Sequence, residues 1–471
     1  MIDTRREVLR VWGKLEISST TTVTKVTLCT IFAALVALVP GWEGLSAAGE
    51  WSLFILLLGA GLWITEAIPS FSVALLIIAL QIVILGKPGG VFAVEANDWQ
   101  IFVQPWSSPL MWLFFGGFVL AEAAQVTGLD RLFSRYVLGW FGTKPGAVLF
   151  GAMAVTFTFS MFMSNTATTA MMMAVIMPIV YSLDKDDPFA KAILLGIPFA
   201  ANIGGMGTII GSPPNAIAAG SLAEVTSIGF VRWMTAGLPP AILLFIIAWL
   251  YLRFAYPARI ANVNISGLQW QTRTGAQLPM WKRLLVMPVF ILTVLLWMTG
   301  PLHHIPTPVV SFLPITIFAI TGIITARNIR NLQWDVLLLL AGGLSLGVGV
   351  RETGLAEWLV AQLPIASLGP MMIAFILAYV ASILSNFMSN TAAANILVPI
   401  GMAIGLGLEA IIVVPIALGA SAAMCLPIST PPNAIAYATG KLDTRDFLRG
   451  GLVIGLLAPG IAALWCYFLF S

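Results

Sequence analysis

The chain has 471 residues, of which 59% are hydrophobic and 9% are charged, and its formal net charge is +3. Soluble domains carry roughly 25% charged residues, so this composition excludes a soluble globular protein. The apolar runs are long and continuous rather than alternating, which excludes a transmembrane β-barrel. We therefore predict an all-α polytopic membrane protein whose segments span or re-enter the bilayer.

Two groups of basic residues bear on the orientation of the chain in the membrane. Arg5, Arg6, Arg10 and Lys14 precede the first apolar run, which begins near Thr27. A second group lies in or beside the polar segment in the middle of the chain: Arg253, Arg259, Arg273, Lys282 and Arg283. The positive-inside rule favours a cytoplasmic location for both groups. We therefore predict a cytoplasmic N-terminal segment over residues 1–26 and a cytoplasmic linker over residues 256–281.

Glu66 and an amphipathic stretch are two charged features of the first half. Glu66, in WITEAIPS, ends an apolar run just before a proline. Both a structural role at a helix end and an intramembrane function are open for it. GLDRLFSRYVLGWF, over residues 128–141, has the pattern of an interfacial helix with Trp140 as its anchor. Residues 352–363 are its expected partner in the second half.

Three features occur twice, in the same order. They are GGFVLAEAAQVTGLDRLF (116–133) with GGLSLGVGVRETGLAEWL (342–359), FMSNT (162–166 and 387–391), and PPNAIA (213–218 and 431–436). We interpret the chain as a tandem duplication. Residues 27–255 hold the first helix or helices and the first repeat, and residues 282–471 hold the second. Duplicated halves are typical of secondary transporters, and an odd number of crossings favours inverted repeats.

Each FMSNT motif interrupts a long apolar stretch. Serine and asparagine favour N-caps and turns over helix interiors, so we predict two re-entrant hairpins, at residues 147–183 and 371–408, with their tips at mid-membrane. Pro213-Pro214 and Pro431-Pro432 break helices, because proline lacks a backbone donor. Irregular backbone at membrane depth is tolerated where it is buried or lines a wet cavity. The four breaks therefore predict one composite site.

The predicted site is rich in neutral oxygen and contains no charge. Oxygen ligands of this kind suit a hard cation such as Na⁺. Residues 145–183, 192–223 and 371–408 contain no Asp, Glu, Lys or Arg. An anion buried there without a counter-charge would be very unfavourable, which favours cation-coupled anion transport. The candidate ligands are Ser160, Ser164, Asn165, Thr166, Ser212, Asn215, Ser385, Asn386, Ser389, Asn390, Thr391, Ser429, Thr430 and Asn433.

The doubled SNT and PPNAIA motifs, together with WITEAIPS, resemble the divalent anion/sodium symporter family, over nearly the whole chain after Trp51. The resemblance, which is to the INDY-type dicarboxylate transporters of bacteria, implies about eleven transmembrane helices, two re-entrant hairpins and two inverted repeats. It implies a homodimer in which a transport domain moves as an elevator against a scaffold domain. It also implies Na⁺ as the coupled ion and a dicarboxylate as the substrate.

The resemblance implies particular residues for each ligand. A first Na⁺ would bind near Ser160, Ser164, Asn165 and Gly211, and a second near Ser385, the Met388 carbonyl, Asn390 and Ser429. The substrate carboxylates would contact Asn165, Thr166, Asn390, Thr391, Thr430 and Pro431. Family members often have Thr in place of Ser385 and Ala in place of Ser429. Neither difference removes an oxygen ligand.

The sequence thus predicts a Na⁺-coupled symporter of a C4-dicarboxylate such as succinate, in a bacterial inner membrane, with a cytoplasmic N-terminus. A Na⁺-independent dicarboxylate exchanger and a sulfate or citrate carrier of the same fold are alternatives. A membrane enzyme is disfavoured, because the two histidines are adjacent in a loop and the SNT regions contain no acid. A channel is disfavoured because duplicated hairpins suit an alternating site. No nucleic-acid partner is expected.

Overall fold

The computed structural model describes residues 21–39, 41–184, 186–223, 225–226, 228–264, 279–362, 368–405 and 407–471. Within these residues every regular element is a helix and no strand occurs, which confirms the all-α class. Residues 1–20 of the predicted N-terminal segment and residues 265–278 of the predicted linker lie outside the described residues. The chain forms two compact units, Met1–Trp106 with Leu338–Pro364 (unit 1) and Ser107–Leu337 with Ile365–Ser471 (unit 2).

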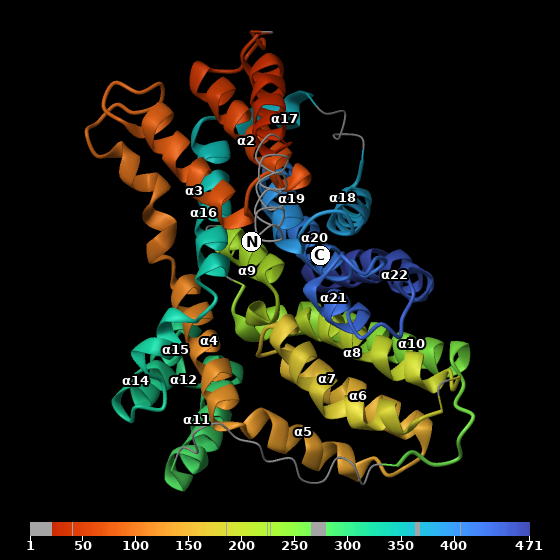
Figure 1. Cartoon of the computed structure of the whole chain (residues 1–471). Helices are drawn as coiled ribbons and strands as arrows, with labels where there is room; N and C mark the ends of the chain where they lie inside the picture. Colours follow the sequence, from red (N-terminus) through yellow and green to blue (C-terminus); the bar gives the residue numbers. More distant parts are fainter. Residues whose placement is uncertain are drawn as a thin grey trace, which may run out of the picture. The chain divides into compact units, whose positions relative to one another are not determined.

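Unit 1 joins the continuous N-terminal segment to a second segment that is distant in sequence (Figure 1). A buried polar contact ties η1 to α16: Gln81 Nε2 donates to the Ser345 carbonyl at 2.9 Å, and Ser345 Oγ donates to Gln81 Oε1 at 2.6 Å. Glu66 is exposed, has φ 47° and caps the C-terminus of α2, which fits its helix-end role. The elements are a helix over Thr21–Leu38, α2 (Ala47–Thr65), α3 (Ser70–Leu80), the π-helix η1 (Gln81–Gly86), the 3₁₀ helix η2 (Asp98–Phe102), most of α16 (Trp334–Glu352) and α17 (Leu355–Gln362).

Unit 2 contains both FMSNT and both PPNAIA motifs. The 3₁₀ helix η3 (Gln104–Ser107) leads into it. The helices of its first part are α4 (Pro109–Thr127), α5 (Leu129–Trp140), α6 (Pro145–Ser160), α7 (Asn165–Ser182), α8 (Phe189–Gly205), η4 (Ile209–Gly211), α9 (Pro213–Leu222) and α10 (Phe230–Ala255). Those that follow are α11 (Met280–Met298), α12 (Gly300–His303), α13 (Thr307–Val310), α14 (Phe312–Ile320), α15 (Ala326–Arg330), α18 (Pro370–Ser385), α19 (Asn390–Ile404), α20 (Glu409–Ser421), α21 (Pro431–Tyr437) and α22 (Thr444–Phe470).

The helices of unit 2 pack in equivalent pairs. Helix α6 packs on α8 and α18 packs on α20, while α10 contacts α8 and α22 contacts α20. The halves also exchange contacts, because α7 packs against α21 and α19 packs against α9 (Figure 1). The duplication seen in the sequence is therefore also present in the packing of the helices.

A polar network joins three helix ends of unit 2. Lys191 Nζ lies 2.7 Å from Asp446 Oδ2 and 3.0 Å from Asp443 Oδ2. Tyr256, at the end of α10, donates its hydroxyl to Asp446 Oδ1 at 2.9 Å. Burial and this hydrogen bond raise the pKa of Tyr256, so its hydroxyl stays protonated at neutral pH. The network connects the start of α8, the start of α22 and the end of α10.

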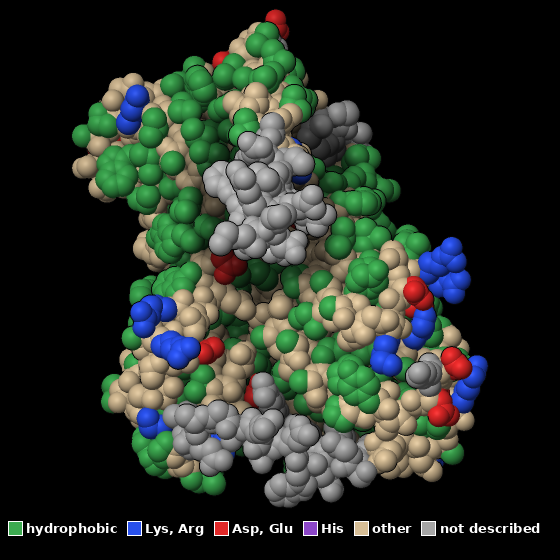
Figure 2. All heavy atoms as spheres, in the orientation of Figure 1, with side chains coloured by type: hydrophobic (Ala, Val, Ile, Leu, Met, Phe, Trp, Pro, Cys, Tyr) green, Lys and Arg blue, Asp and Glu red, His purple; other side chains and the backbone are tan. Residues whose placement is uncertain are grey.

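The surface and the helix lengths are those of a membrane protein. Hydrophobic side chains cover much of the face drawn in Figure 2, and the charged side chains are gathered into a few groups. Within the described residues, 7 helices are long and apolar enough to cross a membrane: Thr21–Leu38, α2, α4, α10, α11, α16 and α22. Shorter apolar helices of 10–17 residues include α6, α18, α19 and α20. The number of eleven crossings stays a prediction.

Candidate functional site

The first FMSNT motif forms the turn between α6 and α7. Helix α6 ends at Ser160, and α7 begins at Asn165. Ser164 is the N-cap of α7, and its Oγ accepts a hydrogen bond from the backbone N–H of Ala167 at 3.5 Å. The sequence predicts a Ser-Asn-Thr turn, but Asn165 and Thr166 already belong to the helix. The reason is the cap: the serine oxygen satisfies a free N–H of the first turn, so the helix begins immediately after it.

Oxygen atoms surround the side-chain amide of Asn165. The amide atom that faces this cluster lies 2.6 Å from Ser160 Oγ, 3.1 Å from the Gly211 carbonyl oxygen and 3.3 Å from that of Ala201. Ser160 Oγ also donates to the Ala201 carbonyl at 2.7 Å, and a hydroxyl has a single proton to give. All three neighbours can therefore act as acceptors toward the Asn165 amide. Such a cluster suits either an amide N–H or a cation, and with a cation Oδ1 becomes a further ligand.

Two adjacent glycines at the end of α8 have different roles. A Cβ at Gly204 would overlap the backbone oxygen of Phe157, so this glycine allows α8 to pack closely on α6. A Cβ at Gly205 would lie 2.7 Å from Asn165 Oδ1 and 3.0 Å from the Gly211 carbonyl oxygen. Gly205 therefore makes room for the oxygen cluster, whereas Gly204 serves helix packing.

The second FMSNT motif repeats the arrangement of the first. Helix α18 ends at Ser385, and α19 begins at Asn390. Ser389 is the N-cap, with its Oγ accepting from the Ala392 N–H at 3.2 Å. Ser385 Oγ donates to Asn390 Oδ1 at 2.7 Å, a separation close to the 2.6 Å between Ser160 Oγ and the Asn165 amide in the first half. Each half thus places one Ser–Asn pair at the start of a hairpin helix.

Asn386 connects the second tip to the segment that precedes α21. Its Oδ1 accepts from the Cys425 N–H at 2.8 Å and from Ser429 Oγ at 3.0 Å. Its Nδ2 donates to the Ser382 carbonyl at 2.8 Å. Ser429 is thereby held at the turn that contains Met388, whose side chain is buried. Asn386 occupies a polar position with no counterpart in the first half, where Met161 stands.

The PPNAIA motifs begin helices α9 and α21. Pro213 and Pro431 each take the first helical position, where the missing N–H has no partner to lose. The asparagine of each motif reaches back to the preceding loop. Asn215 Nδ2 donates to two carbonyls at 2.8 and 2.7 Å, and Asn433 Nδ2 donates to two carbonyls at 3.1 and 2.9 Å. These bonds close equivalent loops in the two halves.

Contacts between the halves join the two loops. Asn202 of α8 donates to Thr430 Oγ1 at 3.1 Å, and Ser421 of α20 donates to Ser212 Oγ at 3.1 Å. Thr430 and Ser212 are the N-caps of α21 and α9. The start of the broken helix in each half is therefore held by a polar side chain from the other half.

The structure groups the predicted site residues in unit 2. Ser160, Asn165 and Gly211 form one cluster, with Ser164 at the adjacent cap. Ser385 pairs with Asn390, and Ser429 is bonded to the turn before it. Thr166 and Thr391 follow the asparagines in the first helical turns, and Thr430 and Pro431 begin α21. Among the described residues, no hydrogen bond joins the Asn165 cluster directly to the Asn390 pair.

The electrostatics of this region come from dipoles rather than from charged side chains. The stretches that contain α7, α9 and α19 have no charged residue. Their N-termini carry partial positive charge, which favours anions. Among the described residues, no group of three or more His, Cys, Asp or Glu side chains could hold a metal ion. A ligand here would meet hydroxyls, amides, backbone carbonyls and helix ends.

Three polar contributors are poorly marked by the sequence motifs. Asn202 and Ser421 lie outside the repeated peptides, and the part played by Asn386 depends on tertiary contacts. A single polar residue inside an apolar helix is the one signal that could have identified Asn202. Its Oδ1 is buried and has no hydrogen-bond partner, as is also true of Asn215 Oδ1 and the hydroxyls of Thr168 and Thr169.

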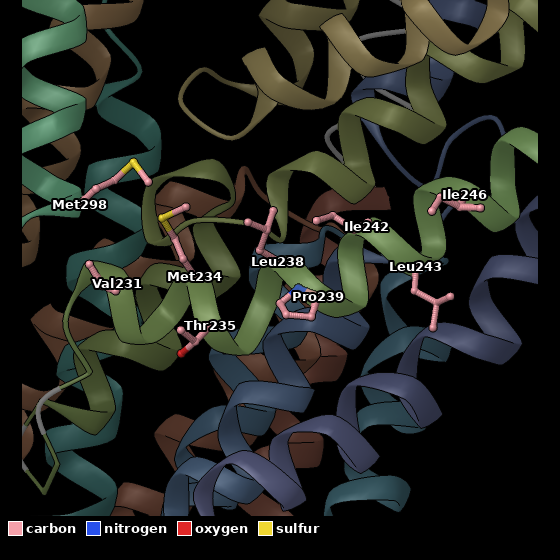
Figure 3. Close-up of a pocket in the computed structure, with 9 residues that line it drawn as sticks. All are labelled: Val231, Met234, Thr235, Leu238, Pro239, Ile242, Leu243, Ile246 and Met298. Carbon is pink, nitrogen blue, oxygen red and sulfur yellow. The ribbon is translucent and has the colours of Figure 1, made fainter. Parts of the chain in front are cut away.

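A cavity of about 580 Å³ lies elsewhere in unit 2 (Figure 3). Its lining comes from α10 and from Met298 at the end of α11. The only polar side chain among the lining residues is Thr235, whose hydroxyl already donates to the Arg232 carbonyl at 2.8 Å. This cavity offers no group that would bind a dicarboxylate, so the candidate site is the polar region around the hairpin tips.

The fold and site are those of a multi-pass membrane protein with two copies of a polar helix-tip motif. Residues 20–470 match the family described as the sodium:sulfate symporter transmembrane region, and the chain belongs to this family of divalent anion/sodium symporters, which are transporters and not enzymes. The chain is 31% identical over 463 residues to the sodium-dependent dicarboxylate transporter SdcS of Staphylococcus saprophyticus, covering 91% of this chain and 87% of the relative. SdcS of Staphylococcus aureus is 31% identical over 466 residues, with 91% and 86% covered.

Proposed function

We propose that the protein is a secondary active transporter that carries a C4-dicarboxylate such as succinate into the cell together with two or more Na⁺ ions. The observation that carries this proposal is the doubled Ser–Asn pair. Ser160 with Asn165 and Ser385 with Asn390 lie at equivalent helix starts, 2.6 and 2.7 Å apart, in stretches without charged residues. The names of the Staphylococcus relatives, which refer to sodium and dicarboxylates, support the choice of ion and substrate.

The two Na⁺ sites follow the two tips. One Na⁺ would bind Ser160, Ser164, Asn165 and the Gly211 carbonyl, because the Ser160 hydroxyl and the Gly211 carbonyl already gather around the Asn165 amide. A second would bind Ser385, the Met388 carbonyl, Asn390 and Ser429, where Ser429 already contacts the tip through Asn386. Neutral oxygens at this spacing suit a hard cation that has lost part of its hydration shell.

The dicarboxylate would bind between the two tips. Its contacts would be the Asn165 and Asn390 amides, the Thr166, Thr391 and Thr430 hydroxyls and the backbone at Pro431. No Lys or Arg lies in these stretches, so bound Na⁺ and the N-termini of α7 and α19 would compensate the dianion. This explains why the dianion would have to travel with the cations: without bound Na⁺ it has no counter-charge in the site.

The same proposal extends to the architecture. Residues 147–183 and 371–408 would be re-entrant hairpins in inverted repeats, and the hairpins would move with the bound ligands as an elevator. The linker over residues 256–281 and the N-terminus would be cytoplasmic. The protein would be a homodimer in a bacterial inner membrane. The equivalent packing of α6 on α8 and of α18 on α20 supports two structurally similar halves.

Uptake of radiolabelled succinate into proteoliposomes with an empty lumen tests the proposal. We expect uptake driven by an inward Na⁺ gradient and none when choline replaces Na⁺. Uptake that requires a dicarboxylate-loaded lumen, regardless of Na⁺, would instead identify an exchanger. Unlabelled sulfate and citrate, added as competitors, separate the remaining substrate classes.

The variant Asn390→Ala tests the site within the same assay. Because the amide would contact both Na⁺ and substrate, its removal should abolish uptake while the protein still purifies as a folded species. Full succinate uptake by this variant would contradict the proposed site. Asn328→Ala is a matched control, because Asn328 bonds Glu122 at 2.8 Å and lies outside the repeated motifs.

A further inference from the structure

Asn433 has a fixed amide orientation. Its terminal amide lies 3.1 Å from the Met424 carbonyl oxygen and 2.9 Å from that of Leu426. Carbonyl oxygens only accept hydrogen bonds, so the nitrogen of the amide must face them. Asn433 Oδ1 therefore points to the opposite side, as an acceptor, inside a fully buried environment.

Asn433 in turn fixes Asn202. The Asn202 amide lies 3.5 Å from Asn433 Oδ1 and 3.1 Å from Thr430 Oγ1. If Asn202 Oδ1 took the position of Nδ2, it would face Asn433 Oδ1 in a buried site. Two amide oxygens that face each other without a proton between them are strongly unfavourable. Asn202 therefore presents its Nδ2 to Thr430. The Asn202 side chain is 1% exposed, so it has no alternative partner in bulk water.

These contacts determine what the Thr430 hydroxyl can do. Thr430 Oγ1 accepts from the Asn433 backbone N–H at 3.3 Å and from Asn202 Nδ2 at 3.1 Å. A hydroxyl has two lone pairs and one proton, so both acceptor positions are used and only the proton remains. Within the part of the chain that the structure describes, no hydrogen bond uses that proton. Thr430 is 3% exposed, so the proton needs an acceptor supplied by a ligand.

The corresponding contact in the other half does not have this effect. Ser421 Oγ bonds Ser212 Oγ at 3.1 Å. Two hydroxyls can exchange donor and acceptor roles by rotating about their C–O bonds, so neither is fixed. The amide of Asn202 cannot reverse its role, because Asn433 prevents it. Only the second broken helix therefore begins with a hydroxyl that is restricted to donation.

We propose that Asn202 is a positioning residue that makes Thr430 an obligatory hydrogen-bond donor to a carboxylate of the transported substrate. This inference rests on the proposed function and adds a specificity element to it. The donated hydrogen bond is stronger to an ionised carboxylate oxygen than to the carbonyl oxygen of a protonated or amidated group, so the hydroxyl favours the ionised form. Asn202 acts from the first half on a helix of the second, so it couples the two halves at the substrate site.

A double-mutant cycle on the full-length purified protein tests the inference. Succinate affinity is measured by binding at saturating Na⁺ for wild type, Asn202→Leu, Thr430→Val and the double variant. Loss of a hydrogen bond to a charged group predicts about a 10-fold weaker affinity for Thr430→Val. Asn202→Leu should weaken binding severalfold on its own and have no further effect once Thr430 is Val. In a Thr430→Ser background, which keeps the hydroxyl, the effect of Asn202→Leu should persist.

Two further measurements separate positioning from general structure. Stabilisation by Na⁺ alone, followed as the thermal unfolding midpoint without succinate, should be the same in wild type and Asn202→Leu. Gln81→Leu removes a buried amide from unit 1 and should lower the unfolding midpoint while succinate affinity is kept.

The outcomes distinguish the inference from the proposed function. Additive losses in the double variant, or a loss of Na⁺ stabilisation in Asn202→Leu, would overturn the role of Asn202 while leaving dicarboxylate transport intact. A wild-type protein that shows no Na⁺-dependent succinate binding would overturn the proposed function and this inference with it.

Discussion

Gly205 is a residue at which one methyl group should affect Na⁺ binding. A Cβ there would lie 2.7 and 2.8 Å from the two terminal atoms of the Asn165 amide, closer than real Cβ contacts come without displacement. We expect Gly205→Ala to move the amide out of the oxygen cluster. The Na⁺ concentration for half-maximal succinate uptake should rise about 10-fold, which corresponds to about 1.4 kcal/mol. Uptake in proteoliposomes over a series of Na⁺ concentrations measures this value.

Gly204→Ala is the matched control for that prediction. Its added methyl group would meet the backbone of Phe157, in the contact between α8 and α6. We expect a lower thermal unfolding midpoint and lower yield, because displacing the backbone of two closely packed helices costs free energy. If both variants change Na⁺ dependence and stability equally, Gly205 serves only helix packing.

At the residue scale, the sequence identifies the motif residues but not what holds them. Repetition marks Asn165 and Asn390 because two copies of one peptide at similar spacing are improbable by chance. Asn202 and Ser421 are not repeated in this way. When the two PPNAIA motifs are aligned, the residue equivalent to Asn202 in the second half is Ala420. Their role arises from the contact of each half with the other, which depends on tertiary packing rather than on any local pattern.

At the element scale, the two hairpin caps provide a natural comparison. Ser164 and Ser389 each accept a backbone N–H at the start of equivalent helices, at 3.5 and 3.2 Å. Only Ser164 belongs to a proposed Na⁺ site. Ser164→Ala and Ser389→Ala should each destabilise the protein by about 1 kcal/mol through loss of the cap. Only Ser164→Ala should also raise the Na⁺ concentration for half-maximal uptake.

Parallel thermal unfolding and Na⁺ titrations of the two cap variants check this expectation. The unfolding midpoints should fall by similar amounts, which provides the internal control. An unchanged Na⁺ dependence in Ser164→Ala would remove this serine from the proposed first Na⁺ site. A shift in Ser389→Ala as large as that in Ser164→Ala would mean that the caps act through helix geometry alone.

Elements were predictable where local chemistry decides them. The glycines of the two TGL sequences, Gly128 and Gly354, have φ values of 68° and 76°, and each separates a long helix from a short one. A left-handed residue at a helix end is typical of glycine, so the repeated motif specifies a repeated turn. The exact start of α7 was less predictable, because the cap at Ser164 draws two polar residues into the helix.

At the scale of the whole molecule, composition alone places the chain in a membrane. The division into units could not be read from the sequence, since unit 1 joins Met1–Trp106 to Leu338–Pro364. A contact such as that between Gln81 and Ser345 links residues from the two repeats. Sequence duplication indicates which segments are equivalent, whereas packing decides which segments are neighbours.

Coupling between Na⁺ and substrate is the property that involves the whole candidate site. With no charged residue in residues 145–183, 192–223 or 371–408, the binding free energy of the dianion must depend on the bound cations. If two Na⁺ ions must bind first, a tenfold decrease in subsaturating Na⁺ should weaken succinate binding by about 100-fold. Equilibrium binding to the purified protein, with choline keeping the ionic strength constant, measures this slope.

Thermodynamic linkage requires the reverse effect as well. Succinate must tighten Na⁺ binding by the same factor by which Na⁺ tightens succinate binding. Na⁺ titrations of the thermal unfolding midpoint, with and without succinate, provide that second measurement. Succinate binding that is independent of Na⁺ would mean that helix N-termini and hydroxyls suffice to hold the dianion, as an exchanger requires. A large coupling, measured in both directions, would instead show that the neutral site binds the dianion tightly only together with its cations.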